Sequence, residues 1–575
     1  MSNYLSKYKL WLESDKVSAE DKDHLRSIAN NDSEIKKCFS EYMAFGTAGL
    51  RSTMGPGTSQ MNVYTVAHTT EAIAKLIIEE KGEKEGVAIA YDSRNNSELF
   101  AKTAASVLAA NGIKVYIFDS VRPTPELSFS LLDHGCIAGI NITASHNPKE
   151  YNGYKVYWKD GAQLPVGHAQ TVTDKAAGID IFDDVHTTDF DEAVKSGIIE
   201  IVGKETDERY LDAVAAQIVD PTAIKKAADS LKVVYTPLHG AGYRLVPEIL
   251  SRVGLKHLYT VPEQMILDGN FPTVVKPNPE YPEVFTLGKK IANDIGSDLI
   301  IATDPDADRL AVTVRKSDGD FVTLTGNQIG LLLIEYIISA YEQNGTMPPS
   351  PFVVKSIVSS YLADAICKAH GVTIYNVLTG FKYIGEMIKL HDGKDGSYIF
   401  GFEESCGYLK GTYARDKDGI VAAMLVCEMA AKYSLEGKTL FDVLNELYAK
   451  YGYSFEKTEE ITTEGLDAKQ KQAALMAAFR ACPPKAFGKV KATRMGDLKA
   501  RKYTDLESGE IELSQFPVSD VLIFELETGD TIVIRPSGTE PKVKFYFLIT
   551  APDKNEAVER FDDYKATLDS FVSSI

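Results

Sequence analysis

Short apolar runs alternate with longer helical patterns along most of this 575-residue chain. That alternation predicts repeated strand-helix-strand units around mostly parallel sheets. The runs expected to form strands lie at residues 87–90, 115–118, 137–142, 233–236, 299–302, 352–354, 398–402 and 532–534, and helices are expected over 72–80, 99–110, 327–340 and 420–432. Open sheets of this kind bind ligands beyond the carboxyl ends of their strands, so polar residues directly after these runs are the first candidates for a functional site.

Several domains are expected, because a chain of this length exceeds what a single hydrophobic core usually holds. Polar segments near residues 205, 322 and 456 separate the patterned blocks, and we place the domains at 1–205, 206–322, 323–456 and 457–575. The last block contains an apolar run at 543–549 and a closing helical pattern at 555–570, which predicts a smaller α+β domain.

The first 40 residues differ from the blocks that follow. They are polar and rich in helix-forming residues, and Tyr8, Leu10, Trp11 and Leu12 form an apolar group suited to packing. We therefore expect a helical extension of the first domain that packs against it.

The charge balance excludes one class of partner. The chain carries 62 Lys and Arg against 81 Asp and Glu, a formal net charge of −19. Such a charge repels a phosphate backbone at long range, so we predict no nucleic-acid partner, and an anionic substrate would need local capture by Arg and Lys. The apolar stretch at 329–338 is interrupted by Glu335, so no membrane partner is expected either.

Cysteine usage indicates the compartment. Six cysteines are scattered without a C-x-x-C pair or the spacing of a metal site. The start of the chain, Met1-Ser2-Asn3-Tyr4-Leu5-Ser6-Lys7, has no apolar signal core. Together these features predict a reduced, cytoplasmic protein.

One hydroxyl follows the expected strand at 137–142. It belongs to Ser145 in Thr143-Ala144-Ser145-His146-Asn147-Pro148, and a serine at a strand end is placed like a nucleophile in a ligand crevice. Pro148 is expected to start a helix whose backbone N–H groups would face a phosphate on Ser145. The side chains of Ser145 and His146 are expected to point apart, since neighbours in extended chain do so. An ordinary turn is the alternative, because these residue types are common turn formers.

Three carboxylates follow the expected strand at 299–302. Asp304, Asp306 and Asp308 occupy alternate positions, which point the same way in extended chain. Like charges that converge repel one another unless a hard cation neutralises them, so the pattern favours Mg²⁺ bound by oxygen ligands. A solvated acidic turn is the alternative. A calcium EF-hand is set aside, because Arg309 and Arg315 stand where that loop needs Gly and Glu.

Both segments resemble signature elements of the α-D-phosphohexomutase family, which includes phosphoglucomutases and phosphomannomutases. Further stretches resemble the family's active-site, sugar-binding and phosphate-binding segments in the family's order: 45–51 (FGTAGLR), 379–382 (TGFK), 401–407 (GFEESCG), 415–419 (RDKDG) and 535–541 (RPSGTEP). The resemblance covers most of the chain. It implies three α/β domains of the βαβ type with mixed, mostly parallel sheets, and a smaller C-terminal α+β domain that acts as a lid, around a central cleft.

The resemblance also implies roles for individual residues. Ser145 would carry a phosphoryl group, and Mg²⁺ would be held by Ser145, Asp304, Asp306 and Asp308. Lys155 would act as the acid/base, its pKa lowered by Arg51 and the cation, with His146 as a supporting hydrogen-bond partner. The substrate would be bound by Arg309, Thr379, Gly380, Lys382, Glu403, Ser405, Arg415, Lys417, Arg535, Ser537, Gly538 and Thr539.

The implied activity is the interconversion of glucose 1-phosphate and glucose 6-phosphate through a phosphoserine enzyme and a 1,6-bisphosphate intermediate, with glucose 1,6-bisphosphate as activator. Small sugar phosphates would be the partners, and the protein would be a monomer or homodimer. The amino-terminal extension and the stretch at 275–280 resemble the longer phosphoglucomutase and phosphopentomutase branch. Phosphopentomutase or phosphomannomutase activity therefore stays open, as does a sugar-phosphate sensor without turnover.

Overall fold

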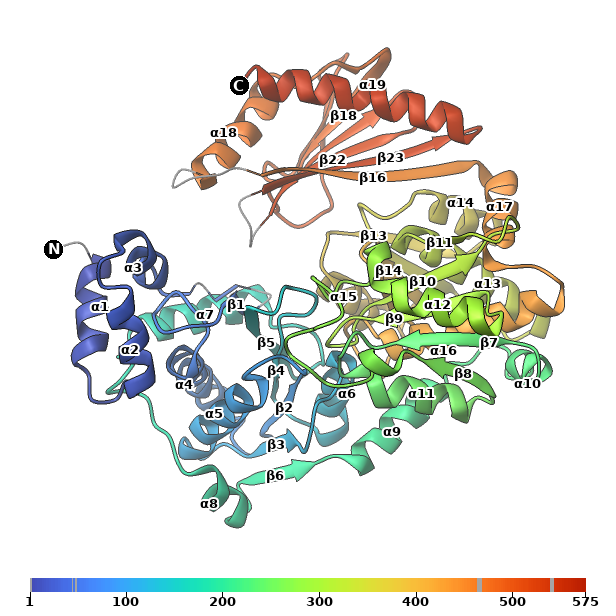
Figure 1. Cartoon of the computed structure of the whole chain (residues 1–575). Coiled ribbons are helices and arrows are strands. Elements are labelled where there is room, and N and C mark those ends of the chain that lie inside the picture. The colour runs from blue at the N-terminus through green and yellow to red at the C-terminus, as the bar shows by residue number, and fades with distance from the viewer. Residues whose placement is uncertain (1–2, 44, 47–48, 463–467, 538–541) are drawn as a thin grey trace. The chain divides into compact units, whose positions relative to one another are not determined.

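The computed structural model describes residues 3–43, 45–46, 49–462, 468–537 and 542–575 (Figure 1). The chain divides into two compact units. Unit 1 comprises Met1–Leu324 together with Gly407–Gly437, and unit 2 comprises Thr325–Cys406 together with Lys438–Ile575. Each unit is therefore assembled from two separate segments of the chain.

The first sheet of unit 1 has the strand order β1-β5-β4-β2-β3-β6. Strands β2, β3, β4 and β6 run parallel, whereas β5 is antiparallel to both β4 and β1. Its strands are Leu50–Thr53, Val87–Tyr91, Val115–Phe118, Ala138–Ile142, Tyr151–Trp158 and Ile199–Val202, for β1 to β6. Helices α5 and α6 pack against these strands; α4 to α9 span Val63–Glu79, Ser97–Ala110, Thr124–His134, Val166–Ala177, Phe190–Lys195 and Lys204–Ala215.

The second sheet of unit 1 has the order β11-β10-β9-β7-β8, with β7, β8 and β9 parallel and β10 and β11 antiparallel to their neighbours. Its strands are Lys232–Thr236, His257–Thr260, Leu299–Thr303, Leu310–Arg315 and Phe321–Thr323, for β7 to β11. The helices are α10 (Ala223–Ala227), α11 (Gly242–Arg252) and α12 (Thr286–Ile295), with short 3₁₀ turns at Pro262–Gln264 and Pro282–Phe285. The second segment of unit 1 contributes β15 (Gly407–Leu409) and α16 (Gly419–Leu435), which packs against α10 and α11.

Unit 2 begins with an α/β layer in which β12 runs parallel to both β13 and β14. These strands are Pro351–Ser356, Thr373–Val377 and Ser397–Glu403, and the helices α13, α14, α15 and α17 are Gly326–Asn344, Leu362–Ala369, Phe381–His391 and Leu440–Tyr451. The C-terminal part of unit 2 is an antiparallel sheet in the order β16-β23-β22-β21-β18-β19-β20, with β17 paired to β18. Helix α19 lies along this sheet (Figure 1) and contacts β16 and β23.

The strands of that sheet, β16 to β23, are Tyr453–Thr462, Ala486–Phe487, Val490–Asp497, Lys502–Asp505, Ile511–Leu513, Leu522–Leu526, Thr531–Pro536 and Lys542–Ala551, and its helices are α18 (Ala468–Ala481) and α19 (Lys554–Ser573).

The predicted fold class, with three α/β layers of mixed sheets and a C-terminal α+β part, is confirmed. The domain boundaries at 205, 322 and 456 stay predictions.

Every strand expected from the sequence is present, but one helix begins much earlier than expected. Helix α4 starts at Val63 instead of residue 72. Asn62 and Thr65 form a capping box, and Thr65, Thr69 and Thr70 are buried although polar. The apolar periodicity did not mark this first half of the helix, because most of its buried residues are polar: Thr65, His68, Thr69 and Thr70 beside Val66.

The helical extension packs as expected, with one exception. Helices α1 (Asn3–Glu13), α2 (Ala19–Ser27) and α3 (Asp32–Phe39) enclose their own apolar cluster, in which Trp11 is fully buried, Tyr8 is buried and Leu12 is partly buried. The prediction for Leu10 is wrong, because its side chain is 48% exposed on the other side of α1. Trp11 contacts Tyr64 of α4 and Phe182 edge-on, which joins the extension to the first sheet domain.

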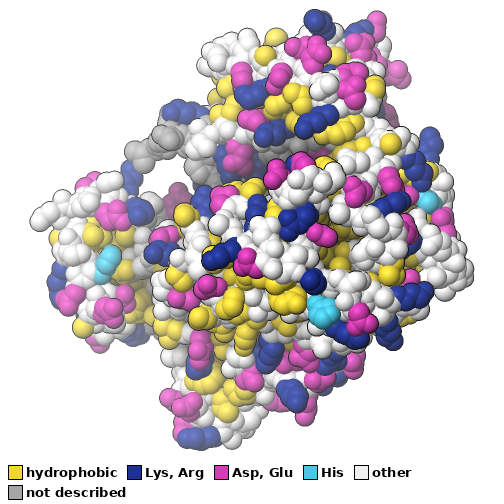
Figure 2. Space-filling view, turned by 45° about the vertical axis from the view of Figure 1, so that its right-hand side comes forward, with side chains coloured by type: hydrophobic (Ala, Val, Ile, Leu, Met, Phe, Trp, Pro, Cys, Tyr) yellow, Lys and Arg dark blue, Asp and Glu magenta, His cyan; other side chains and the backbone are white. Residues whose placement is uncertain are grey.

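The surface carries charges of both signs. On the face that Figure 2 shows, Lys and Arg side chains are interspersed with Asp and Glu. Among the helices that the structure describes, none is both long and apolar enough to cross a membrane.

Replacing Trp11 with alanine is expected to loosen the extension. The indole has ring contacts at centroid distances of 5.1 to 5.6 Å with Phe39, Tyr64 and Phe182. Its loss should lower the free energy of unfolding of this region by about 3–5 kcal/mol. Urea denaturation and limited proteolysis would measure the change. Leu10→Ala on the same helix is the control and should shift stability by less than ~0.5 kcal/mol; equal effects of the two variants would contradict the packing described.

Candidate active site

Ser145 lies in a buried turn directly after β4. Its backbone N–H donates to Thr143 Oγ1 at 2.8 Å, and its own Oγ donates to Asp304 Oδ2 at 2.7 Å. The residue has a φ of +52°, in the left-handed region that costs energy for a residue with a Cβ. Thus the end of β4 and the acidic turn after β9 face each other within unit 1, as the sequence analysis expected.

The prediction that Pro148 starts a helix is wrong. Residues 145–150 contain two short turns, at 145–146 and 149–150, and no helix, and the chain then enters strand β5 at Tyr151. Strand β5 pairs antiparallel with β4, so residues 143–150 close a hairpin connection instead of a strand-helix unit. A phosphoryl group on Ser145 would therefore have no N-terminus of a helix starting at Pro148 to face.

The expectation that the side chains of Ser145 and His146 point apart is also wrong. Ser145 Oγ and His146 Nδ1 lie 3.2 Å apart. Neighbouring side chains diverge only in extended chain, and the left-handed backbone of Ser145 removes that condition. Burial lowers the pKa of His146 well below 6.5, and the charges of Arg309 and Arg51 lower it further, so the imidazole is neutral near pH 7.

The three predicted carboxylates converge, though not through extended chain. Asp304, Asp306 and Asp308 are all buried and offer ligand oxygens within 4.8 Å of one another. They sit on a turn between β9 and β10, and Ala307 has a φ of +51°. The turn folds the three side chains inward, which the alternate spacing alone did not require.

Two lysines and a second hydroxyl, besides that of Ser145, face these carboxylates. Lys155 Nζ lies 2.7 Å from Asp306 Oδ2 and 3.2 Å from Asp308 Oδ2, and Lys417 Nζ lies 3.3 Å from Asp308 Oδ2. The Thr124 hydroxyl donates to Asp306 Oδ2 at 2.6 Å. Two cations therefore balance part of the charge of three acids.

The carboxylates respond to this environment in opposite directions. Burial, with the charges of Asp306 and Asp308 beside it, raises the pKa of Asp304 well above its usual value. Burial opposes the ionisation of Asp306 as well, but the Lys155 ammonium and its hydrogen bond hold the pKa of Asp306 below its usual value. A proton is thus favoured on the carboxylate nearest Ser145, and a cation bound there would displace it.

Lys155 is cationic in this arrangement. Burial acts to lower its pKa, but Asp306, Asp308 and Asp416 outweigh burial and raise it above the usual value. The lowering expected with a bound cation stays a prediction. Acid/base work by Lys155 requires that its carboxylate partners lose negative charge first.

The acidic turn fits a hard divalent cation. Asp306 Oδ1 and Asp308 Oδ1 are buried and have no hydrogen-bond partner among the described residues. Buried carboxylate oxygens without partners are costly unless a cation coordinates them. Asp304, Asp306 and Asp308, with Ser145 beside them, are the residues that could hold such an ion.

Three arginines of unit 1 from the predicted set have different partners. Arg51 on β1 donates to Asn147 Oδ1 at 3.1 Å, next to the serine turn. Arg309 donates to Glu280 Oε1 at 2.6 Å. Arg415 donates to the carbonyl groups of Thr412 and Ala414 in its own loop.

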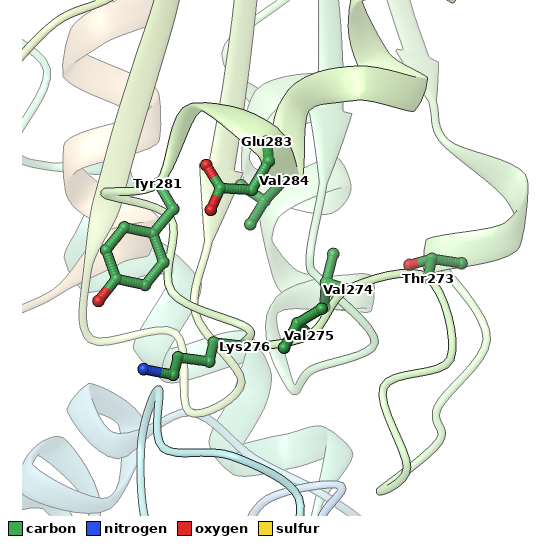
Figure 3. A pocket seen from close by; sticks show the side chains of 7 residues that line it. All are labelled: Thr273, Val274, Val275, Lys276, Tyr281, Glu283 and Val284. Atoms are coloured by element: carbon green, nitrogen blue, oxygen red, sulfur yellow. The ribbon is translucent and has the colours of Figure 1, made fainter.

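Glu280 belongs to a long loop that also borders a cavity of about 460 Å³. Figure 3 shows the side chains that line it: Thr273, Val274, Val275, Lys276, Tyr281, Glu283 and Val284. Val275 is 94% exposed at its rim. The cavity lies entirely within unit 1, and the described contacts assign no role to it.

The remaining predicted residues lie in unit 2. The Gly380 N–H donates to Glu403 Oε1 at 2.7 Å, which brings the segment of Thr379, Gly380 and Lys382 next to the loop at 401–407. Ser405 lies on the turn after β14, Arg535 is on β22, and Ser537 N–H donates to Lys542 O. Gly538 and Thr539, like Thr47 and Ala48 of the N-terminal motif, lie outside the described residues.

Several contributing residues were missed from the sequence. The Thr124 hydroxyl has no motif that marks it. Asp416 accepts from Tyr157 Oη at 2.7 Å and raises the pKa of Lys155, yet it was passed over between Arg415 and Lys417. In unit 2, Tyr546 is buried, and the charges of Glu404 and Arg535 act on it. Only the RDKDG match offered a signal, for Asp416.

Known proteins match nearly the whole chain. Three family profiles, described as phosphoglucomutase/phosphomannomutase alpha/beta/alpha domains I, II and III, match residues 42–181, 208–319 and 325–451. A phosphoglucomutase of Staphylococcus saprophyticus is 35% identical over 528 residues, 91% of this chain and 93% of that protein. The chain belongs to the α-D-phosphohexomutase family. A phosphoglucomutase of Staphylococcus epidermidis is also 35% identical, over 95% of this chain and 98% of its own.

Solved structures agree on the fold of this phosphohexomutase. A phosphoglucomutase/phosphomannomutase family protein from Burkholderia thailandensis has a TM-score of 0.66 at 17% identity, covering 92% of this chain and 97% of its own. Parafusin from Paramecium, named as a phosphoglucomutase, has a TM-score of 0.67 at 16% identity, covering 92% and 94%. At these identities the likeness establishes the fold alone.

Added Mg²⁺ is expected to raise the thermal midpoint. At ~100 times its Kd, one bound ion stabilises the native state by ~2.7 kcal/mol. Asp308→Asn should abolish most of this shift, because Asp308 is one of the three converging carboxylates. Asp318→Asn, an exposed carboxylate of the same unit paired with Lys316, is the control and should keep it. A full Mg²⁺ shift in Asp308→Asn would exclude the proposed site.

His146 is expected to make stability depend on pH below 6.5. Its imidazole is neutral in the folded state, whereas the unfolded state takes up a proton as the pH falls through 6.5, so stability is lost toward lower pH. At pH 5.5 this loss is about 1.4 kcal/mol. His146→Gln should remove it, so wild type and variant should diverge from pH 8 to pH 5.5 in urea denaturation. Parallel curves over this range would contradict a neutral His146.

Proposed function

We propose that this protein is a phosphoglucomutase that interconverts glucose 1-phosphate and glucose 6-phosphate. Phospho-Ser145 would transfer its phosphoryl group to the substrate, giving a 1,6-bisphosphate whose other phosphoryl group returns to the serine. The observation that carries the proposal is the 2.7 Å contact between Ser145 Oγ and Asp304, in a buried cluster of three carboxylates. The 35% identity to named phosphoglucomutases over nearly the whole chain supports the choice of reaction.

Charge neutralisation is the main catalytic task in phosphoryl transfer. Mg²⁺ on Asp304, Asp306 and Asp308 would supply positive charge beside the transferring group. Arg51 next to the serine turn and Arg309 after the acidic turn would add fixed positive charge. Burial and the charges of these two arginines also keep His146 neutral, with its Nδ1 3.2 Å from Ser145 Oγ.

Lys155 is the proposed acid/base. Its Nζ would take the proton of the attacking sugar hydroxyl and return it in the reverse direction. The carboxylates of Asp306 and Asp308 hold that nitrogen in place at 2.7 and 3.2 Å. Because those carboxylates raise its pKa, a cation that draws off their charge would also make Lys155 the better base.

Substrate recognition is assigned to unit 2 and to two residues of the returning segment of unit 1. Glu403 and Ser405 would bind sugar hydroxyls, with Thr379, Gly380 and Lys382 beside them and Arg415 and Lys417 completing the set. Arg535 and Ser537, with Gly538 and Thr539, would hold the phosphate not being transferred. Arg535 Nη1 is buried without a hydrogen-bond partner among the described residues, which suits an anionic ligand.

Further parts of the proposal concern the setting of the enzyme. Glucose 1,6-bisphosphate would phosphorylate Ser145 and thus act as activator. The six cysteines are all unpaired, which supports a reducing cytoplasmic location. A monomer or homodimer and the absence of nucleic-acid and membrane partners stay predictions.

Three other functions remain as alternatives to phosphoglucomutase activity: two are mutases with the same fold, and the third is a binding protein without catalysis. A phosphopentomutase would prefer ribose 1-phosphate or deoxyribose 1-phosphate, and a phosphomannomutase would prefer mannose phosphates. A sugar-phosphate sensor would bind these ligands without turnover. The buried serine, triad and Lys155 favour turnover, because a sensor gains nothing from an activated hydroxyl beside three acids.

Ser145→Ala is expected to abolish mutase activity, because the phosphoryl group would have no oxygen to return to. Incubation of wild type with glucose 1,6-bisphosphate and Mg²⁺ should add the mass of one phosphoryl group, which intact-mass spectrometry would detect and Ser145→Ala would lack. Ser106→Ala, a buried serine on α5 outside the site, is the control and should keep both activity and labelling. Labelled wild type that gives no product from any of these sugar phosphates would overturn the proposal in favour of the sensor.

A further inference from the structure

We propose that Arg94 is a positioning residue, which fixes the serine turn so that Ser145 Oγ faces the acidic cluster. The inference rests on the proposed role of Ser145 as the phosphoryl carrier. Arg94 follows β2 and is only 3% exposed, yet the sequence analysis gave it no task. Its guanidinium touches no reacting group and acts only through the backbone of the turn.

Four carbonyl groups of the turn accept hydrogen bonds from this one guanidinium. Nη2 donates to the carbonyls of Ser145 and Asn147. Nη1 donates to the carbonyls of Pro148 at 2.9 Å and Tyr151 at 3.1 Å. The accepting residues extend from Ser145 to Tyr151, along most of the connection between β4 and β5. The guanidinium therefore restrains the backbone conformation of this connection.

The other edge of Arg94 is fixed by Asp92. Arg94 Nε lies 3.3 Å from Asp92 Oδ2, and both side chains are fully buried. Asp92 Oδ2 also accepts from the Thr143 hydroxyl at 2.6 Å, and Thr143 Oγ1 in turn accepts from the Ser145 N–H at 2.8 Å. The acid and the arginine therefore hold the two ends of the same short turn.

The aromatic ring of Phe271 covers the guanidinium. The ring centroid lies 5.0 Å from Arg94 Cζ, within the range of a cation–π contact. The loop of Phe271 packs tightly against the residue that follows Arg94. A Cβ added to Gly269 of this loop would lie only 2.3 Å from Asn95 N. The loop belongs to the half of unit 1 that carries the acidic turn, so this contact links the serine turn to that half a second time.

Such a restraint is needed because Ser145 has a left-handed backbone. A residue with a Cβ holds that conformation only where its surroundings over-determine it. A lysine ammonium has three donors on a point charge and cannot span four carbonyls as the planar guanidinium does. Without the guanidinium of Arg94, the turn relaxes and Ser145 Oγ moves away from Asp304. The substrate-binding residues keep their positions.

Arg94→Lys tests this directly, with Mg²⁺ and glucose 1,6-bisphosphate present. We expect kcat to fall about 100-fold, the size of effect that misplacement of a reacting group produces. KM for glucose 1-phosphate should stay within ~3-fold, because uniform substrate binding is untouched. The single-turnover rate of Ser145 phosphorylation, followed by intact mass, should fall by the same factor as kcat.

Arg122→Lys is the matched control. Arg122 is also buried, but its guanidinium pairs with Asp207 and Asp119 instead of the serine turn. This variant should lose thermal stability and keep kcat within ~2-fold. Equal losses of kcat in both variants would reduce Arg94 to a general structural role and overturn the inference, as would an unchanged kcat in a folded Arg94→Lys.

Phe271→Leu keeps the test decisive if Arg94→Lys does not fold. It leaves all four carbonyl bonds in place but uncovers the guanidinium, so kcat should fall by about 3- to 10-fold with KM unchanged. An unchanged kcat in Phe271→Leu, with Arg94→Lys unfolded, would overturn the inference. Absence of mutase activity in the wild type would instead overturn the proposed function, so the two failures are distinguishable.

Discussion

The balance of charge around three buried carboxylates is the constraint on which the rest of the site depends. Asp304, Asp306 and Asp308 are almost wholly removed from solvent, where their mutual repulsion would be prohibitive without partners. Lys155 and Lys417 supply two positive charges, Arg309 Nε lies 3.9 Å from Asp308 Oδ1, and a proton or a metal ion would supply more. That requirement connects metal binding, the basicity of Lys155 and the state of the serine hydroxyl in a single electrostatic system.

Two backbone turns place the polar side chains around these carboxylates. Ser145 and Ala307 both have left-handed backbones, one after β4 and the other after β9. Each conformation folds a polar segment back toward the end of its sheet. Thr143 Oγ1 accepts from the Ser145 N–H of the first turn, and the Thr124 hydroxyl donates to Asp306 of the second. Both turns of the site thus hold backbone strain, while the strands behind them are regular and apolar.

Much of this arrangement could be predicted from local sequence. The strands β4 and β9 are continuous apolar runs, and the serine and acids follow them directly, so a site at the strand ends followed from periodicity. The predictions of a helix at Pro148 and of diverging Ser145 and His146 side chains were wrong, because both depend on the backbone of one turn. The hairpin pairing of β4 with β5 and the left-handed backbone of Ser145 set that turn, and the apolar pattern of the sequence marks neither. The pKa of Lys155, in contrast, depends on Asp306, which is far away in the chain.

The order of strands and helices, the family, and the acidic and nucleophilic residues could all be read from the amino-acid sequence, because periodicity and motifs are properties of adjacent positions. Only the tertiary structure decided that Ser145 is left-handed, that Arg94 gathers four carbonyls beneath it, and that Lys155 is held cationic by acids more than 150 positions away. The physical reason is that turn geometry and pKa are set by the neighbours that folding brings together, and those neighbours have no fixed spacing in the chain.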